Sequence, residues 1–266
     1  MKAILSRAGL AALREFCEKE PLLVFDFDGT LSPIVRNPDR ARMRSRTMAL
    51  LGMVCGKYKT AVLSGRERSD VQSRLNGIPA AFVIGNHGLQ WGKKKAPALA
   101  AAQIRKWQEI MQKSLSEEGL RDDLIHVENK LHSLSIHIRD PGLLKRAMKR
   151  AESLPGARVI AGKNVLNLLP VDSMHKGSAV ISLAAKTRKK SVLFIGDDVT
   201  DEDVFSLDPP FRLLTIRVGR LRNSRAAYFL NGQEHMDAFL KELIRLRKLP
   251  APLPGQRRET RRAGHS

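Results

Sequence analysis

Two aspartates one residue apart follow an apolar run and precede a Gly-Thr turn in the stretch LLVFDFDGT, which begins at Leu22. The apolar run predicts a buried strand. Ligands of parallel sheets bind at the carboxyl ends of the strands, and alternation along the chain points Asp26 and Asp28 toward one crevice. Carboxylates this close require a cation, and Mg²⁺ prefers carboxylate, carbonyl and phosphate oxygens. Because Asp-x-Asp also occurs in ordinary turns and helix caps, this stretch alone leaves its role open.

A division of labour between the two carboxylates is chemically reasonable. Asp26 is the candidate nucleophile, because a carboxylate that attacks phosphorus forms an aspartyl-phosphate. Asp28 is placed to protonate the leaving oxygen and then to activate water. Gly29 permits the sharp exit from the strand, and Thr30 can bond to the loop or to phosphate.

Two further segments have chemistry suited to a phosphate. Ser64, Gly65 and Arg66 follow the predicted strand TAVL and open a helical segment, and a hydroxyl with backbone amides at a helix start binds phosphate. Lys176, at the start of a predicted helix in HKGSAV, can neutralise phosphate and orient the nucleophile. Taken singly, an ordinary helix cap and a surface lysine remain the alternatives.

A second apolar run, VLFIGDDVTDEDVF, also ends in acids, Asp197, Asp198 and Asp201. Asp197 is the first candidate for a metal ligand, and Asp201 is expected to help through water or an outer contact. Asp198 is an alternative or additional ligand. Four such segments in order, each at a predicted strand or helix end, favour phosphoryl transfer far more strongly than any one of them.

Alternating strand and helix patterns predict an α/β fold with a mostly parallel sheet covered by helices. The predicted strands are 22–27, 60–63, 81–84, 191–195 and 213–218. The predicted helices are 3–19, 40–55, 66–76, 176–187, 201–206 and 234–248.

The segment 92–170 has a different pattern. In LIHVENKLHSLSIHIR, His132, Leu134, Ile136 and Ile138 share one face of a strand, whereas Ser133, Ser135, His137 and Arg139 share the other. This segment also contains predicted helices near 99–118 and 142–153 and predicted strands at 157–161 and 164–169. We therefore expect a catalytic core at 1–91 and 171–249, a specificity cap at 92–170 and a basic disordered tail at 250–266.

Composition places the chain among soluble globular proteins, with 42% hydrophobic and 28% charged residues. No apolar run approaches the roughly 20 residues that span a bilayer, and arginines interrupt the N-terminal segment, so neither a membrane partner nor a signal peptide is expected. Two isolated cysteines, Cys17 and Cys55, fit a reducing, cytoplasmic location.

The formal net charge is +20, of which residues 241–266 contribute +6. A basic surface that collects an anionic substrate accounts for this charge. The basic residues lack interleaved aromatic side chains, so no nucleic-acid partner is expected. Binding of polyanions by the tail remains an alternative.

Asp26-x-Asp28-Gly-Thr, Ser64, Lys176 and Gly-Asp197-Asp198 resemble the four motifs of the haloacid dehalogenase (HAD) superfamily of phosphohydrolases. Within it, the segments DFDGTLSPIV, LSGR, GNHG and GDDVTDEDVF resemble the trehalose-6-phosphate phosphatases. The resemblance covers residues from about 20 to 245. It implies a Rossmann-like core with an inserted α/β cap, and Mg²⁺-dependent hydrolysis of trehalose 6-phosphate.

The resemblance also implies sugar-binding residues in the cap. Glu128, Lys130 and Ser133 match the family's Glu-x-Lys pair and following serine, and His137 lies further along the same strand face. Charged groups of this kind form strong hydrogen bonds to hydroxyls. A solvated strand face is the alternative. Arg66 and His87, the latter in GNHG, match family positions near the site.

Three positions depart from the family pattern. Asn167 stands where a glutamate that contacts the sugar is usual, Leu169 where a basic residue is usual, and Asn86 where GNHG replaces Ala-Glu-His-Gly. Asn167 can still bond a hydroxyl but lacks charge. The alternatives are a HAD phosphatase for sucrose phosphate or mannosyl-phosphoglycerate, and a basic polyanion-binding protein on a HAD core.

Overall fold

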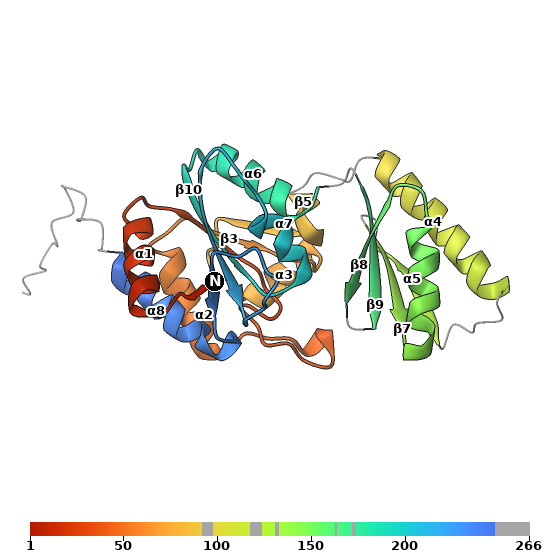
Figure 1. Ribbon diagram of the computed structural model, residues 1–266, viewed down its shortest axis with the longest axis horizontal. Coiled ribbons are helices and arrows are strands. Elements are labelled where there is room, and N and C mark those ends of the chain that lie inside the picture. Colours follow the sequence, from red (N-terminus) through yellow and green to blue (C-terminus); the bar gives the residue numbers. More distant parts are fainter. Residues whose placement is uncertain (92–97, 118–123, 131–132, 163, 172–173, 248–266) are drawn as a thin grey trace, which may run out of the picture.

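The computed structural model describes residues 1–91, 98–117, 124–130, 133–162, 164–171 and 174–247. Two β-sheets organise these residues (Figure 1). We call the eight-stranded sheet with its helices the core, and the four-stranded sheet with its helices the cap. The basic tail predicted at 250–266 lies outside the described residues.

The core sheet has the strand order β1-β12-β11-β10-β2-β3-β4-β5. All neighbouring pairs are parallel except β4 with β5. The strands are β1 Lys2–Ala3, β2 Leu22–Phe25, β3 Thr60–Leu63, β4 Phe82–Gly85, β5 Gln90–Trp91, β10 Ser191–Gly196, β11 Arg212–Val218 and β12 Tyr228–Leu230. From β2 the chain builds the sheet in one direction and from β10 in the other. The switch point at which ligands bind in such sheets therefore lies between β2 and β10.

Helices cover both faces of the core sheet (Figure 1). They are α1 Arg7–Cys17, α2 Ser45–Cys55, α3 Arg68–Leu75, α6 Lys176–Thr187, α7 Glu202–Phe205 and α8 Met236–Leu246. Short 3₁₀ turns adjoin them: η1 Pro38–Arg40, η2 Asn86–Gly88, η4 Val199–Asp201 and η5 Gln233–His235. The strand β2 shows why both faces are covered, since Leu23 and Phe25 pack with α1, α2, α3 and α8, and Leu22 and Val24 with α6 and α7. A strand buried on both faces reads as a continuous apolar run.

The cap is an antiparallel sheet of order β6-β7-β9-β8 with helices on one face. Its elements are α4 Ala98–Glu117, β6 Ile125–Asn129, β7 Leu134–Ile138, η3 Pro141–Leu143, α5 Leu144–Glu152, β8 Ala157–Gly162 and β9 Val165–Pro170. Leu134, Ile136 and Ile138 pack against these helices as their alternation predicts. The opposite face of the sheet is turned toward the core (Figure 1).

Most predicted elements are confirmed, with shifted ends. The strand 60–63 is found at the predicted residues, whereas the strand predicted at 22–27 ends at Phe25. The helix predicted at 3–19 begins only at Arg7, because Lys2–Ala3 pairs with β12 and the Ser6 side chain caps the helix by accepting from the Gly9 N–H. The helices predicted from 40 and from 66 likewise begin late, at Ser45 and Arg68.

The α/β fold class is confirmed, and the exact domain limits stay a prediction. All strands of the core sheet lie within 1–91 and 171–249, and all strands of the cap sheet within 92–170. Within the described part of the chain, no helix combines the length and the apolar composition that crossing a membrane requires.

Candidate active site

The candidate site lies at the carboxyl ends of the central core strands. Asp26 directly follows β2, Asp197 follows β10 and Ser64 follows β3. The Asp26 N–H donates to the Ile195 carbonyl at 2.9 Å, which ties the residue to β10. The predicted residues of three separate segments therefore meet at the switch point of the sheet.

Three carboxylates converge there. Asp26, Asp197 and Asp201 each offer an oxygen, and these oxygens lie within 4.8 Å of one another. Asp26 and Asp201 are buried and Asp197 is half-buried. Burial, followed by the charge of Asp201, raises the pKa of Asp197 to about 7, and burial also raises the pKa of Asp26. Crowded carboxylates of this kind favour a bound cation.

Lys176, the first residue of α6, bridges two of these acids. Its buried Nζ donates to Asp26 Oδ1 and to Asp201 Oδ1, both at 2.7 Å. Burial alone would lower the pKa of the ammonium, but the charges of Asp201 and Asp26 raise it above its ordinary value. The lysine is therefore charged and fixed, as a group that orients a nucleophile has to be.

The donor set fits a divalent cation. When all three carboxylates are ionised, they exceed the one ammonium by two negative charges in a largely buried cluster, and hard cations prefer such oxygen ligands. Glycines make the approach possible: a Cβ on Gly29 would lie 2.0 Å from Asp197 Oδ2, and one on Gly196 would lie 2.3 Å from the Asp201 carboxyl group. Side chains at either position would fill the cradle.

Two of the five predicted metal ligands do not direct their carboxylates into this cluster. Asp198 is exposed, and its Oδ1 accepts from the Val199 N–H at the start of η4. Its own N–H donates to Asp201 Oδ2 at 2.8 Å, so it orients Asp201 through the backbone. The carboxylate of Asp28 is bound to Arg66.

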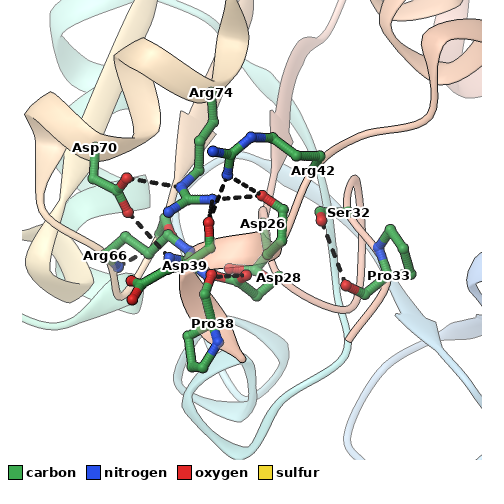
Figure 2. Close-up of polar contacts among 12 residues, drawn as sticks. Asp26, Asp28, Ser32, Pro33, Pro38, Asp39, Arg42, Arg66, Asp70 and Arg74 are labelled. Atoms are coloured by element: carbon green, nitrogen blue, oxygen red, sulfur yellow. Dashed lines mark hydrogen bonds and ion pairs between the residues drawn. The ribbon is translucent and has the colours of Figure 1, made fainter. Parts of the chain in front are cut away.

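Arg66 holds Asp28 by a bidentate ion pair. Arg66 Nε donates to Asp28 Oδ2 at 2.6 Å and Nη2 to Oδ1 at 2.7 Å. Nη2 also donates to the Pro38 carbonyl at 2.8 Å, and Nη1 donates to Asp70 Oδ2 at 3.0 Å (Figure 2). Asp28, the predicted acid and base, is thus paired with Arg66, a predicted substrate-binding residue.

Ser64 and Thr30 are fixed by short contacts around the cluster. Buried Ser64 accepts the Arg66 N–H through Oγ at 3.1 Å, and its carbonyl accepts the His87 N–H at 2.9 Å. Buried Thr30 donates through Oγ1 to Asp197 Oδ1 at 3.1 Å. Thr30 thus contacts the acidic cluster directly, whereas the contacts of Ser64 are with Arg66 and His87.

His87 packs directly over Gly65. A Cβ on Gly65 would lie 2.5 Å from His87 Cε1, so only glycine fits there. Burial, then the charge of Lys176, and more weakly those of Lys130 and Arg158, lower the pKa of His87 to about 3. The imidazole is therefore neutral at physiological pH. Lys130 and Arg158 belong to the cap, and Arg158 also forms an ion pair with Asp203 of the core.

The open face of the cap sheet carries a polar cluster. Glu128 Oε2 accepts from His137 Nε2 at 2.9 Å and lies 3.4 Å from Lys130 Nζ. Burial would raise the pKa of Glu128, but the His137 hydrogen bond and the Lys130 charge lower it. Three of the predicted sugar-binding residues are therefore brought together, and Glu128 is ionised.

Asn167 lies in the same row of the cap sheet. Glu128 pairs with Ser135 across β6 and β7, and Ser135 pairs with Asn167 across β7 and β9. Asn167 Oδ1 accepts from Ser135 Oγ at 2.7 Å. Ser133 is buried at the start of this hairpin, where its carbonyl accepts the Lys130 N–H. The predicted set thus spans three adjacent strands.

Four residues of this neighbourhood were not predicted. Arg158 of β8 forms an ion pair with Asp203 of α7 and thereby joins the cap to the core. Asp70 and Arg74 of α3 form an ion pair next to Arg66. Asp203 lies in the acid-rich segment GDDVTDEDVF, which signals a site, but no pattern in the sequence distinguishes the other three.

Comparisons with known proteins agree with this arrangement. The family model described as trehalose-phosphatase matches residues 24–231. A trehalose-phosphate phosphatase of Mycobacterium tuberculosis strain H37Rv is 30% identical over 211 residues, which cover 72% of this chain and 52% of that protein. A probable trehalose-phosphate phosphatase G of Arabidopsis thaliana is 29% identical over 284 residues, covering 93% of this chain and 74% of that protein. The chain spans about half the length of the mycobacterial relatives that it matches.

Solved structures show the same fold. The C-terminal domain of the Candida albicans trehalose-6-phosphate phosphatase superposes with a TM-score of 0.73 at 22% identity, covering 92% of this chain and 98% of that one. This likeness confirms the predicted α/β fold with a mostly parallel sheet. Since the family model matches most of the sequence, including all four motifs, the chain belongs to the trehalose-phosphatase family.

Proposed function

We propose that this protein is a Mg²⁺-dependent phosphatase that hydrolyses trehalose 6-phosphate to trehalose and phosphate, as a step of trehalose biosynthesis. The observation that carries the proposal is the buried group at the switch point, in which Lys176 fixes Asp26 and Asp201 beside Asp197. Membership of the trehalose-phosphatase family supports trehalose 6-phosphate as the substrate.

In the first step, a carboxylate oxygen of Asp26 attacks phosphorus and the bond from phosphorus to the sugar oxygen breaks. A proton passes from the Asp28 carboxyl group to the departing oxygen, which leaves as a sugar hydroxyl. Ser64 and Lys176 stabilise the charge on the phosphoryl oxygens, because both are buried and held by hydrogen bonds. The products of this step are trehalose and an aspartyl-phosphate at Asp26.

In the second step, water attacks the aspartyl-phosphate. Asp28, now a carboxylate, accepts a proton from that water as its oxygen bonds to phosphorus. The bond between phosphorus and Asp26 breaks, which releases phosphate and restores the Asp26 carboxylate. Asp28 has regained its proton for the next substrate.

Mg²⁺ is the cation proposed for the acidic cluster. Asp26, Asp197 and the backbone carbonyl of Asp28 would hold it, with Asp201 acting through water or through Lys176. When bound, it would neutralise phosphate oxygens and the crowded carboxylates. The chain's own contribution is a cradle whose geometry Lys176 and the glycines 29 and 196 maintain.

The cap is proposed to select the sugar. Glu128, Lys130, His137 and Asn167 would bond its hydroxyls, and Arg66 and His87 would contribute from the core side. The support is their convergence on one face of the cap sheet turned toward the core.

Free thiols at Cys17 and Cys55 support a cytoplasmic location.

The test is release of inorganic phosphate from trehalose 6-phosphate, sucrose 6-phosphate, mannosyl-phosphoglycerate and glucose 6-phosphate, each with Mg²⁺ and with EDTA. We expect strong preference for trehalose 6-phosphate, abolished by EDTA and restored by added Mg²⁺. Metal-dependent turnover of another sugar phosphate would contradict the assigned substrate and point to Asn167, the uncharged residue of the cap row. Absence of turnover would contradict the enzymatic function as a whole.

A further inference from the structure

A chain of ion pairs leads from Asp28 along one side of α3. Arg66 lies between the carboxylates of Asp28 and Asp70, and Asp70 lies between Arg66 and Arg74 (Figure 2). Arg74 Nε donates to Asp70 Oδ1 at 2.8 Å, and its Nη1 donates to the carbonyls of Ala41 and Asp39. Arg74 is almost fully buried, so this end of the chain of charges is anchored in the fold.

The bidentate ion pair with Arg66 occupies the carboxylate of Asp28 in this structure. Both carboxylate oxygens of Asp28 accept from Arg66, at 2.6 and 2.7 Å. An oxygen bound in this way cannot carry the proton that a leaving sugar oxygen requires. The carboxyl group of Asp28 therefore has to break at least one of its two hydrogen bonds with Arg66 before the first step of the proposed reaction.

Arg66 is also held by groups other than Asp28. Four of its five N–H groups are used: two bind Asp28, one binds the Pro38 carbonyl and one binds Asp70. The bond to Asp70 supplies a second negative charge, which Arg74 in turn holds in position. The hydrogen bonds from Arg74 and Arg66 lower the pKa of Asp70 even though burial opposes this, so Asp70 keeps its charge.

We propose that Asp70 is a positioning residue that competes with Asp28 for Arg66 and so allows Asp28 to turn toward the leaving group. This inference rests on the proposed function, because it assigns Asp28 as the proton donor. Asp70 is on the first turn of α3, outside the acidic cluster, and neither the motifs nor the resemblance assigned it a role.

The test compares leaving groups in Asp70→Asn. Asparagine keeps the size of the side chain and one oxygen acceptor but removes the charge, so Arg66 should bind Asp28 more tightly. A sugar alkoxide needs a proton to leave, whereas p-nitrophenolate leaves without one. We expect kcat/KM for trehalose 6-phosphate to fall about tenfold, and kcat/KM for p-nitrophenyl phosphate to change by less than about twofold.

The quantity kcat/KM reports steps up to departure of the leaving group, so the shared hydrolysis of the aspartyl-phosphate does not affect the comparison. The ratio of the two values, measured on one preparation, is also independent of how much of the variant is folded. Asp70→Glu, which restores the charge, should bring the ratio back to within about threefold of wild type. Asp39→Asn removes a charge from an exposed side chain on the neighbouring turn η1 and should leave the ratio unchanged.

Equal losses for both substrates in Asp70→Asn, or no loss for either, would overturn the inference while wild-type turnover upheld the proposed function. A wild type that cleaves neither ester would overturn both. If the wild type cleaves only aryl esters, phenyl phosphate replaces the sugar phosphate, because phenoxide is a much more basic leaving group than p-nitrophenolate. The same selective loss is expected there, and its absence would overturn the inference.

Discussion

The core and the cap present charged side chains to the same space in different ways. In the core, the strands are buried on both faces, and the functional groups follow the strand ends, where Lys176, Asp26 and Asp201 are all nearly inaccessible to solvent. In the cap, one sheet face is open, and the polar groups stand on the strands themselves, with side-chain exposures of 44% for Glu128 and 43% for His137. Burial therefore separates the two sets of charges.

This difference has energetic consequences. Removing one partner of a buried ion pair costs about 3–5 kcal/mol, because the other charge is left uncompensated. An exposed pair contributes only about 0–1 kcal/mol. We infer that core residues determine whether any phosphate ester is cleaved, and that cap residues change the preference among esters by smaller amounts.

The largest effect is expected from Asp26→Asn. The amide cannot form the aspartyl-phosphate, so kcat should fall by at least about a thousandfold for sugar and aryl phosphates alike. Stopped assays of phosphate release measure both. Asp208→Asn, which changes an exposed aspartate between α7 and β11, serves as the matched control and should retain activity. Turnover near the wild-type rate in Asp26→Asn would refute the nucleophile assignment.

A smaller and selective effect is expected from Glu128→Gln in the cap. Loss of the charge weakens hydrogen bonds to sugar hydroxyls, so KM for trehalose 6-phosphate should rise about tenfold. Hydrolysis of p-nitrophenyl phosphate should not change, because its aryl group offers no hydroxyls. Glu152→Gln, at the exposed end of α5, is the control on the opposite side of the cap sheet. A parallel loss for both substrates would break the proposed division between core and cap.

The sequence predicted the core more fully than the cap contacts, for a physical reason. Buried strands carry continuous apolar runs, so β2, β3 and β10 were predictable, as were the acids that follow them. The strands β1, β5 and β12 have two or three residues each and are too short to show a period. They belong to the sheet through pairing with neighbours that only the fold supplies.

The pairings within the site were beyond the reach of the sequence. Asp28 and Arg66 were both predicted as site residues. Their residue types do not indicate that the Arg66 guanidinium binds both carboxylate oxygens of Asp28. The contact depends on where η1 and α3 place their backbones, since the Pro38 carbonyl and Asp70 complete the binding of Arg66. Similarly, Lys176 was predicted to neutralise phosphate and to orient the nucleophile, Asp26, whereas its second hydrogen bond, to Asp201, emerged only from the structure.

The ion pair between Arg158 and Asp203 tests how firmly the cap is held against the core. Both side chains are partly exposed, so a modest effect is expected: Arg158→Gln and Asp203→Asn should each raise KM for trehalose 6-phosphate by about threefold. The double variant should be no worse than either single one, because both changes remove the same contact. Additive losses in the double-mutant cycle would show that the two residues act separately.

The smallest effect is expected on the pKa of His87 in the core, which the cap charges of Lys130 and Arg158 help to lower. Its pKa is about 3 in the folded protein, against an ordinary value of 6.5. As the pH falls from 6.5 toward 3, His87 becomes protonated in the unfolded chain but stays neutral in the folded protein. This difference lowers the free energy of unfolding as the pH falls. His87→Asn, which suits the left-handed backbone at this position, should weaken that decline.

The measurement is urea unfolding of wild type and His87→Asn between pH 4 and 7. The raised pKa values of Asp26 and Asp197 act with the opposite sign, since the folded protein binds their protons first, but they occur in both proteins. Lys130→Gln extends the test to the cap. Since the Lys130 charge helps to lower the His87 pKa, its removal should raise that pKa slightly and flatten the pH dependence by a smaller amount. An unchanged His87 pKa in Lys130→Gln, followed by NMR titration, would mean that the cap stands further from the core in solution than the structure places it.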